Sequence, residues 1–172
     1  MKKNVRAFTF IEVIVYIGLF SLLGTALFSF AWDMIVLKEK SYTQQTITEE
    51  ARLSLEYMKF QIRNSAGIDE ANSSWDNNNG KLVVEIFGSS DTVTFEKENG
   101  GIIMRRSGRD SVRMHSRDFQ ARDLIFESYR DRAGKVSSVG IQVTLETTEN
   151  ISQEYRAVFS LKTSVSLRNH SL

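Results

Sequence analysis

The most unusual side chain of this chain is Glu12, an acid within a long apolar stretch. The stretch covers residues 8–37, and no charged residue occurs in it from Val13 to Trp32. A carboxylate placed in a bilayer costs several kcal/mol unless it finds a partner, so an acid here indicates a functional role. The chemistry open to Glu12 is pairing with a positive charge, which is strong where the dielectric constant is low.

A run of arginines between residues 105 and 122 forms a second candidate group. Its members are Arg105, Arg106, Arg109, Arg113, Arg117 and Arg122, of which the first five are candidate contacts for an anion or a partner. Such a group can contact the phosphates of DNA, but a single aromatic residue in the span, Phe119, gives little support for base stacking. We therefore expect a solvated hairpin face, or a docking surface for acidic partner chains, ahead of a DNA contact.

Two other features could serve as metal ligands. Residues 76–80, Asp-Asn-Asn-Asn-Gly, gather oxygen ligands of the kind that calcium prefers. They lack the spacing and the distal glutamate of an EF-hand, and such clusters are more often plain turns. His115 and His170 have no ligand-like neighbours, and we expect both at the surface.

The motifs of common enzymes are absent from the sequence. The chain has no nucleophile motif, no glycine-rich phosphate loop and no metal-spaced cluster of histidine or cysteine. These patterns predict a protein that is not an enzyme, with no catalytic residues, no metal and no cofactor. The formal net charge of +1 gives no indication of a nucleic-acid partner.

The apolar stretch that carries Glu12 has the length of a membrane-spanning helix. About 20 apolar residues suffice for an α-helix to cross a bilayer. Lys2, Lys3 and Arg6 precede the stretch, and the positive-inside rule then keeps the amino terminus in the cytoplasm and sends the rest of the chain outward. We expect a single-pass protein of the cytoplasmic membrane.

Beyond Lys38 the helical period continues, but on one face. The apolar residues of this face are Ile47, Ala51, Leu55, Met58, Ile62 and Ala66. Spacings of four and three are typical of an amphipathic helix, which can cover a sheet with its apolar side. We expect the helix to end at Ala66, because Gly67 is a natural stop.

After a polar loop at 68–80, the pattern changes from helical to alternating. The expected strands are 82–87, 92–96, 102–106, 124–129, 139–146 and 155–167. The turn at residues 99–101, Asn-Gly-Gly, predicts a hairpin between the second and third of these strands. The predicted fold class is α+β: a long amino-terminal helix packed on a mainly antiparallel β-sheet.

The amino-terminal sequence RAFTFIEVIVYIG resembles the class III signal of type IV pilins and pseudopilins. In that family a short basic leader and a small residue precede the cut, and an aromatic residue, threonine, apolar residues and glutamate follow it. The resemblance implies cleavage between Ala7 and Phe8, with methylation of the new amino terminus at Phe8. The chain departs from the family pattern at Ala7, where glycine is usual.

The resemblance also implies a task for Glu12. In the family, this acid of an incoming subunit is thought to neutralise the free amino terminus of a neighbour in the membrane, which guides assembly. The chain would then divide into a leader, a transmembrane helix, an amphipathic continuation of that helix and an extracytoplasmic β-rich domain. Their ranges are 1–7, 8–37, 38–67 and 68–172.

Within this family the chain most resembles minor pilins and J-type minor pseudopilins. The similarity lies in the helix segment EEARLSLEYMKFQIRNSAG and in the ending LKTSVSLRN, and the chain lacks the cysteines of many major pilins. The implied function is a structural subunit of a type IV pilus-like filament. Its implied partners are a prepilin peptidase and methylase, other pilin or pseudopilin subunits and the membrane platform of the assembly machine. The alternatives are a type II secretion minor pseudopilin and an uncleaved single-pass anchor that displays a binding domain.

Overall fold

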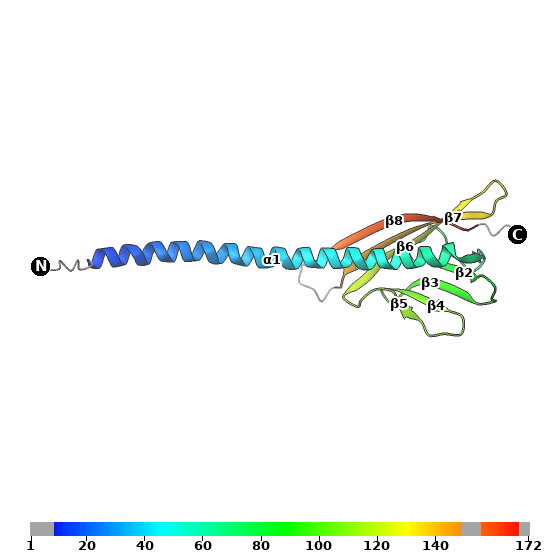
Figure 1. The fold of residues 1–172 in the computed structure, drawn as a ribbon, viewed down its shortest axis with the longest axis horizontal. Coiled ribbons are helices and arrows are strands. Elements are labelled where there is room, and N and C mark those ends of the chain that lie inside the picture. Colours follow the sequence, from blue (N-terminus) through cyan, green and yellow to red (C-terminus); the bar gives the residue numbers. More distant parts are fainter. Residues whose placement is uncertain (1–8, 149–155, 169–172) are drawn as a thin grey trace, which may run out of the picture. The chain divides into compact units, whose positions relative to one another are not determined.

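The chain forms one helix followed by eight β-strands in a computed structural model that describes residues 9–148 and 156–168 (Figure 1). The elements are α1 (Phe10–Arg63), β1 (Ser65–Ile68), β2 (Lys81–Ile86), β3 (Thr92–Glu98), β4 (Gly101–Arg106), β5 (Val112–Arg113), β6 (Phe119–Arg130), β7 (Val136–Thr147) and β8 (Val158–Ser166). All strand pairs are antiparallel. The predicted α+β class is confirmed, and the order of elements is pilin-like.

The chain divides into two units, residues 1–41 and 42–172, and α1 contributes to both. In the first unit every residue from Val13 to Ile35 is exposed. Within the described ranges, α1 is the one helix that is long and apolar enough to cross a membrane. Its composition suits a single span, because an apolar surface of this kind is unfavourable in water.

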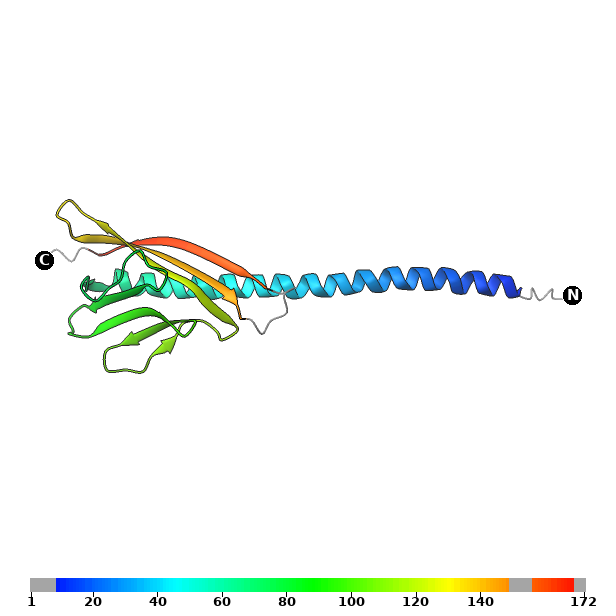
Figure 2. The ribbon, with the colours of Figure 1, turned by 180° about the vertical axis from the view of Figure 1, so that it is seen from behind.

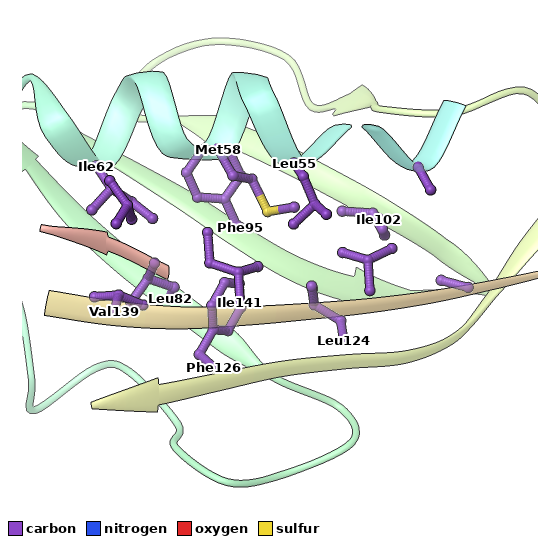
Figure 3. Close-up of a cluster of buried hydrophobic side chains, with 14 of the residues drawn as sticks. Leu55, Met58, Ile62, Leu82, Phe95, Ile102, Leu124, Phe126, Val139 and Ile141 are labelled. Atoms are coloured by element: carbon purple, nitrogen blue, oxygen red, sulfur yellow. The ribbon is translucent and has the colours of Figure 1, made fainter. Parts of the chain in front are cut away.

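In the second unit, α1 turns one stripe of side chains toward the strands. The buried residues of this stripe are Ile47, Ala51, Ser54, Leu55, Met58 and Ile62. Figure 3 shows Leu55, Met58 and Ile62 pointing from the helix toward the strands that carry Phe95 and Ile141. The predicted amphipathic stripe is therefore confirmed from Ile47 to Ile62.

The strands form two sheets, with the orders β1-β2-β3-β4-β5 and β6-β7-β8. Figure 2 shows the carboxy-terminal part of α1 running alongside the strands of both sheets. One hydrophobic cluster joins the helix stripe to both sheets and includes Phe95 of β3 and Phe126 of β6. The alternating pattern predicted strands and a helical cover, but it did not specify the division into two sheets.

Helix α1 ends at Arg63, and the predicted end at Ala66 is wrong. The residues of β1 pair antiparallel with β2 instead of continuing the helix. Ser65 is buried, and its Oγ donates to the carbonyl oxygen of Ile62 at 2.7 Å, which satisfies one acceptor of the last turn. Pairing with β2 thus outweighs the apolar period that continues to Ala66 in the sequence.

The hairpin of β3 and β4 is confirmed. Asn99 and Gly100, its turn residues, both have positive φ, 49° and 67°, as a two-residue type I′ turn requires. The expected strand at 155–167 corresponds to β8, and residue 155 lies outside the described residues. β5 was missed, because two residues are too few to show an alternating pattern.

Truncating Leu55 should destabilise the second unit far more than truncating Leu53. Leu55 is 2% exposed and Leu53, on the same helix, is 68% exposed. We expect Leu55→Ala to lower the free energy of unfolding by about 2–5 kcal/mol, and Leu53→Ala by less than about 0.5 kcal/mol. Hydrogen exchange of the β3 and β7 amides in the detergent-solubilised full chain measures both effects. Equal losses would contradict the assignment of the stripe to the core.

Candidate functional site

Glu12 lies in the first turn of α1, in contact with Thr9 just before the helix and with Tyr16 one turn later. The Thr9 carbonyl oxygen accepts from Glu12 N at 3.1 Å, and Thr9 Oγ1 accepts from the same nitrogen at 3.4 Å, as a capping residue does. The Tyr16 hydroxyl donates to Glu12 Oε1 at 3.4 Å. A carboxylate in the first turn also interacts favourably with the positive end of the helix dipole. The side chain is therefore positioned at the beginning of the exposed apolar surface.

Two hydroxyls in the apolar segment are satisfied within the helix. Ser21 Oγ donates to Ile17 O at 2.7 Å, and Thr25 Oγ1 donates to Ser21 O at 2.8 Å. Gly18 leaves open space, because a Cβ built there would meet no atom within 4 Å. Small side chains with internal hydrogen bonds suit a helix that approaches other helices closely in lipid.

The predicted cleavage site lies outside the described residues. This applies to Ala7, to Phe8 and to the whole leader, residues 1–7. Cleavage and methylation stay predictions, and Glu12 is the described member of the predicted assembly site.

Two candidate arginines of β4 are paired with carboxylates of β3 or of the residue just before it. Arg105 Nε lies 2.9 Å from Glu96 Oε1, and Arg105 Nη2 contacts Glu98. Arg106 Nη2 lies 3.6 Å from Asp91 Oδ2. These ion pairs reduce the positive charge that an approaching anion would meet.

The remaining candidate arginines differ in their use. Arg113 Nη2 donates to the carbonyl oxygens of Gly100 and Phe119, both at 3.1 Å, so this side chain holds backbone. Arg109 and Arg117 are exposed, and neither forms an ion pair with another residue in the described part of the chain. The predicted anion or partner contact stays a prediction, and these two are its most accessible members.

His115 is buried, and the expectation of a surface histidine is wrong. It is 6% exposed, its Nε2 accepts from Ile102 N at 3.1 Å, and its Nδ1 lies 2.9 Å from Ser116 O. These contacts require the neutral ring with its hydrogen on Nδ1, since Nε2 faces a donor. Burial lowers the pKa of His115, the hydrogen bond to Ser116 opposes this shift, and the charge of Arg113 adds to it. His170 lies outside the described residues.

Helix α1 holds the segment that follows β5, a contact that the sequence pattern did not indicate. Ser54 Oγ donates to Met114 O at 3.0 Å, and Glu50 Oε2 accepts from Ser116 N at 3.1 Å. Together with His115, these bonds tie the segment to both α1 and β4. A serine inside the apolar stripe was the one signal that could have pointed to Ser54, because a buried hydroxyl needs a partner.

The loop at residues 76–80, the candidate calcium site, is attached to β6 by its backbone. Asp76 N donates to Phe126 O at 2.9 Å, Gly80 N donates to Leu124 O at 2.7 Å, and Asn78 O accepts from Leu124 N at 3.0 Å. A Cβ at Gly80 would lie 2.5 Å from Leu124 O, so this approach requires glycine. Across the described ranges, no group of three or more histidine, cysteine or acidic side chains is placed to hold a metal ion. The backbone of β6 therefore fixes the course of this loop.

Comparison of the chain with known protein families, with curated proteins and with solved structures finds no match. Its similarity to pilins is one of shape, a long apolar amino-terminal helix followed by antiparallel sheets.

Acidification should destabilise the second unit through His115. An unfolded histidine binds a proton near pH 6.5, about its ordinary pKa, whereas burial keeps the pKa of His115 lower in the folded chain. Stability is therefore complete above about pH 6.5 and is lost as the pH falls through the folded pKa, because the unfolded state binds more protons.

His115→Gln should remove this part of the pH dependence, which thermal unfolding between about pH 5 and pH 8 measures. The difference between wild type and variant isolates His115 from other titrating groups. The same loss of stability on acidification in both proteins would contradict this role of the buried ring.

Proposed function

We propose that this chain is a structural subunit of a type IV pilus-like filament, a minor pilin or pseudopilin held in the cytoplasmic membrane before assembly. The observation that carries the proposal is a glutamate in the first turn of a long apolar helix whose outer part packs on antiparallel sheets. Such a helix can exchange lipid for neighbouring helices, since both surroundings are apolar. In this role the chain is assembled and is not a catalyst.

Glu12 would guide assembly by pairing with the positive charge at the amino terminus of a neighbouring subunit. A carboxylate without a cation is costly where the dielectric constant is low, and a cationic partner offsets that cost. The Tyr16 hydroxyl supports Glu12 within one chain, but it supplies no positive charge. Glu12 thus keeps the capacity to accept a cation when a neighbour arrives.

Processing would supply that amino terminus. Cleavage between Ala7 and Phe8 by a prepilin peptidase would create it, and methylation at Phe8 would follow. The basic residues before the apolar segment would keep the leader on the cytoplasmic side, where they favour retention. Further partners are other pilin or pseudopilin subunits and the membrane platform of the assembly machine.

A type II secretion pseudopilin would use the same helix and the same acid, so deletion of the gene separates the two machines. Loss of protein secretion would assign the chain to type II secretion. Loss of twitching or of transformation would assign it to a pilus.

Glu12→Ala should leave processing intact and reduce incorporation into filaments. We expect incorporation to fall at least about tenfold, since the loss of about 1.4 kcal/mol of pairing free energy suffices for that change. The measurement is the ratio of subunit in sheared filaments to subunit in membranes. Glu49→Ala, which removes an exposed acid of the same helix beyond the apolar segment, is the matched control and should incorporate normally. Normal incorporation of Glu12→Ala would contradict the proposed pairing.

A further inference from the structure

β8 is an edge strand of the three-stranded sheet, so one side of its backbone bonds to β7 and the other side faces away from the sheet. Beyond the ends of its ladder, Thr147 N donates to Ala157 O at 3.0 Å and Leu167 N donates to Ser137 O at 2.9 Å. In an antiparallel pair, alternate residues bond to the partner strand. The odd-numbered residues of β8 therefore bond to β7, and the even-numbered residues direct their N–H and C=O groups away from it.

The outward-facing groups of β8 form a regular row. They belong to Val158, Ser160, Lys162, Ser164 and Ser166, whose side chains are all exposed. Within residues 9–148 and 156–168, these backbone groups have no recorded hydrogen-bond partner. Figures 1 and 2 both show β8 at the margin of the strands. A row of this kind is a template for another strand.

The other sheet edges of the described chain are short or covered. At the ends of the five-stranded sheet, β1 has four residues and β5 has two. The outer edge of β6 is covered from Ala121 to Phe126, because Asn79 forms a bridge with Leu124, Gly100 O accepts a hydrogen bond from Ala121 N at 2.8 Å, and Asp76 N donates one to Phe126 O at 2.9 Å. β8 has nine residues and is the long exception.

The usual protection of an edge strand is missing from β8. A lysine on an edge normally discourages pairing, but Lys162 Nζ donates to Glu127 Oε1 at 2.5 Å, on β6 beyond β7. The Lys162 side chain therefore crosses the outer face of the sheet and is directed away from the free edge. Gly140 of β7 leaves room for Glu127, since a Cβ there would come within 3.1 Å of Glu127 Oε2. The chain also contains no proline that could block this edge.

We propose that the outer edge of β8 binds an extended segment of another protein, which adds to the sheet as a further strand. On the inner face, Phe159 and Leu161 are only partly buried and pack against the core cluster. They leave apolar surface at the edge, which a segment with an apolar residue at every second position would cover. The outer face carries the hydroxyls of Ser160 and Ser164, so the segment needs no charge there.

A second copy of this chain suits the edge less well. Its other edges are short or covered, so β8 itself is the strand it would offer. Antiparallel pairing of two β8 strands about their centre would set Lys162 opposite Lys162. Each lysine is paired with Glu127 of its own chain, but the two like charges would still lie across from each other, which is less favourable than a neutral residue there. The occupant is therefore a different polypeptide.

A peptide with the sequence of β7, Val136–Thr147, is a suitable probe, because β8 already accepts that strand on its other side. Fluorescence anisotropy measures its binding to the full chain in detergent micelles. Two further peptides carry N-methyl groups at alternate residues, one at the odd positions and one at the even positions. An added strand bonds to β8 through the amides of every second residue. The peptide that is methylated at those residues should therefore lose at least about tenfold in affinity, because several backbone hydrogen bonds are lost at once. The other should bind like the parent peptide.

Substitutions in β8 test the same edge by changing the protein in place of the peptide. Ser160→Pro combined with Ser164→Pro removes two outward N–H donors and leaves the donors to β7 in place, so it should abolish binding. Ser160→Thr combined with Ser164→Thr keeps both donors and should bind normally. If the proline variant fails to unfold cooperatively, the difference in affinity between the two methylated peptides still tests strand addition.

Three results would overturn the proposal. The first is no binding of the parent peptide, and the second is equal binding of all three peptides. The third is a dimer of the full chain that the proline variant separates, which would assign the edge to a second copy.

Discussion

The two apolar surfaces of α1 are the constraint on which the rest of the structure depends. From Val13 to Ile35 the helix is exposed on every side, and this apolar surface is compatible with contact to lipid or to other helices. From Ile47 to Ile62 the helix buries one stripe, and both sheets pack against it. One continuous helix thus carries an exposed apolar segment and a segment that forms part of the core of a folded domain. A change in what surrounds the first segment need not disturb the second, because the two surfaces are satisfied by different partners.

Three of the candidate arginines serve the structure of the second unit itself. Arg105 and Arg106 pair with carboxylates, and Arg113 donates to backbone carbonyls. His115 and Ser54 hold the segment after β5 with neutral hydrogen bonds. Of the candidate arginines, Arg109 and Arg117 therefore stay the most accessible for recognition. The backbone of β8 presents a different means of recognition, because its unoccupied amides and carbonyls select an extended chain and depend little on charge.

The parts of the fold that follow from local periodicity were predictable. The spacing of Leu55, Met58 and Ile62 predicted the buried stripe, and the turn at Asn99 and Gly100 predicted the hairpin. The division into two sheets, the two-residue strand β5 and the early end of α1 depend on pairing between distant segments, which no local pattern encodes. The burial of His115 was missed for the same reason, since a single histidine forms no periodic pattern in the sequence. For the candidate site, Glu12 was identifiable as an acid in an apolar run. The carboxylate partners of Arg105 lie on the neighbouring strand, so they required the register of β3 and β4.

The central claim is that the apolar helix with Glu12 near its start belongs to a processed filament subunit. Mass spectrometry of the amino-terminal peptide tests this claim most directly, with full-length protein extracted from membranes of a host that has an active prepilin peptidase. The account predicts a chain that begins at Phe8 and carries a methyl group on its amino terminus. A chain that still carries the leader MKKNVRA in that host would contradict the claim. It would leave a membrane-anchored protein whose outer domain displays a binding surface.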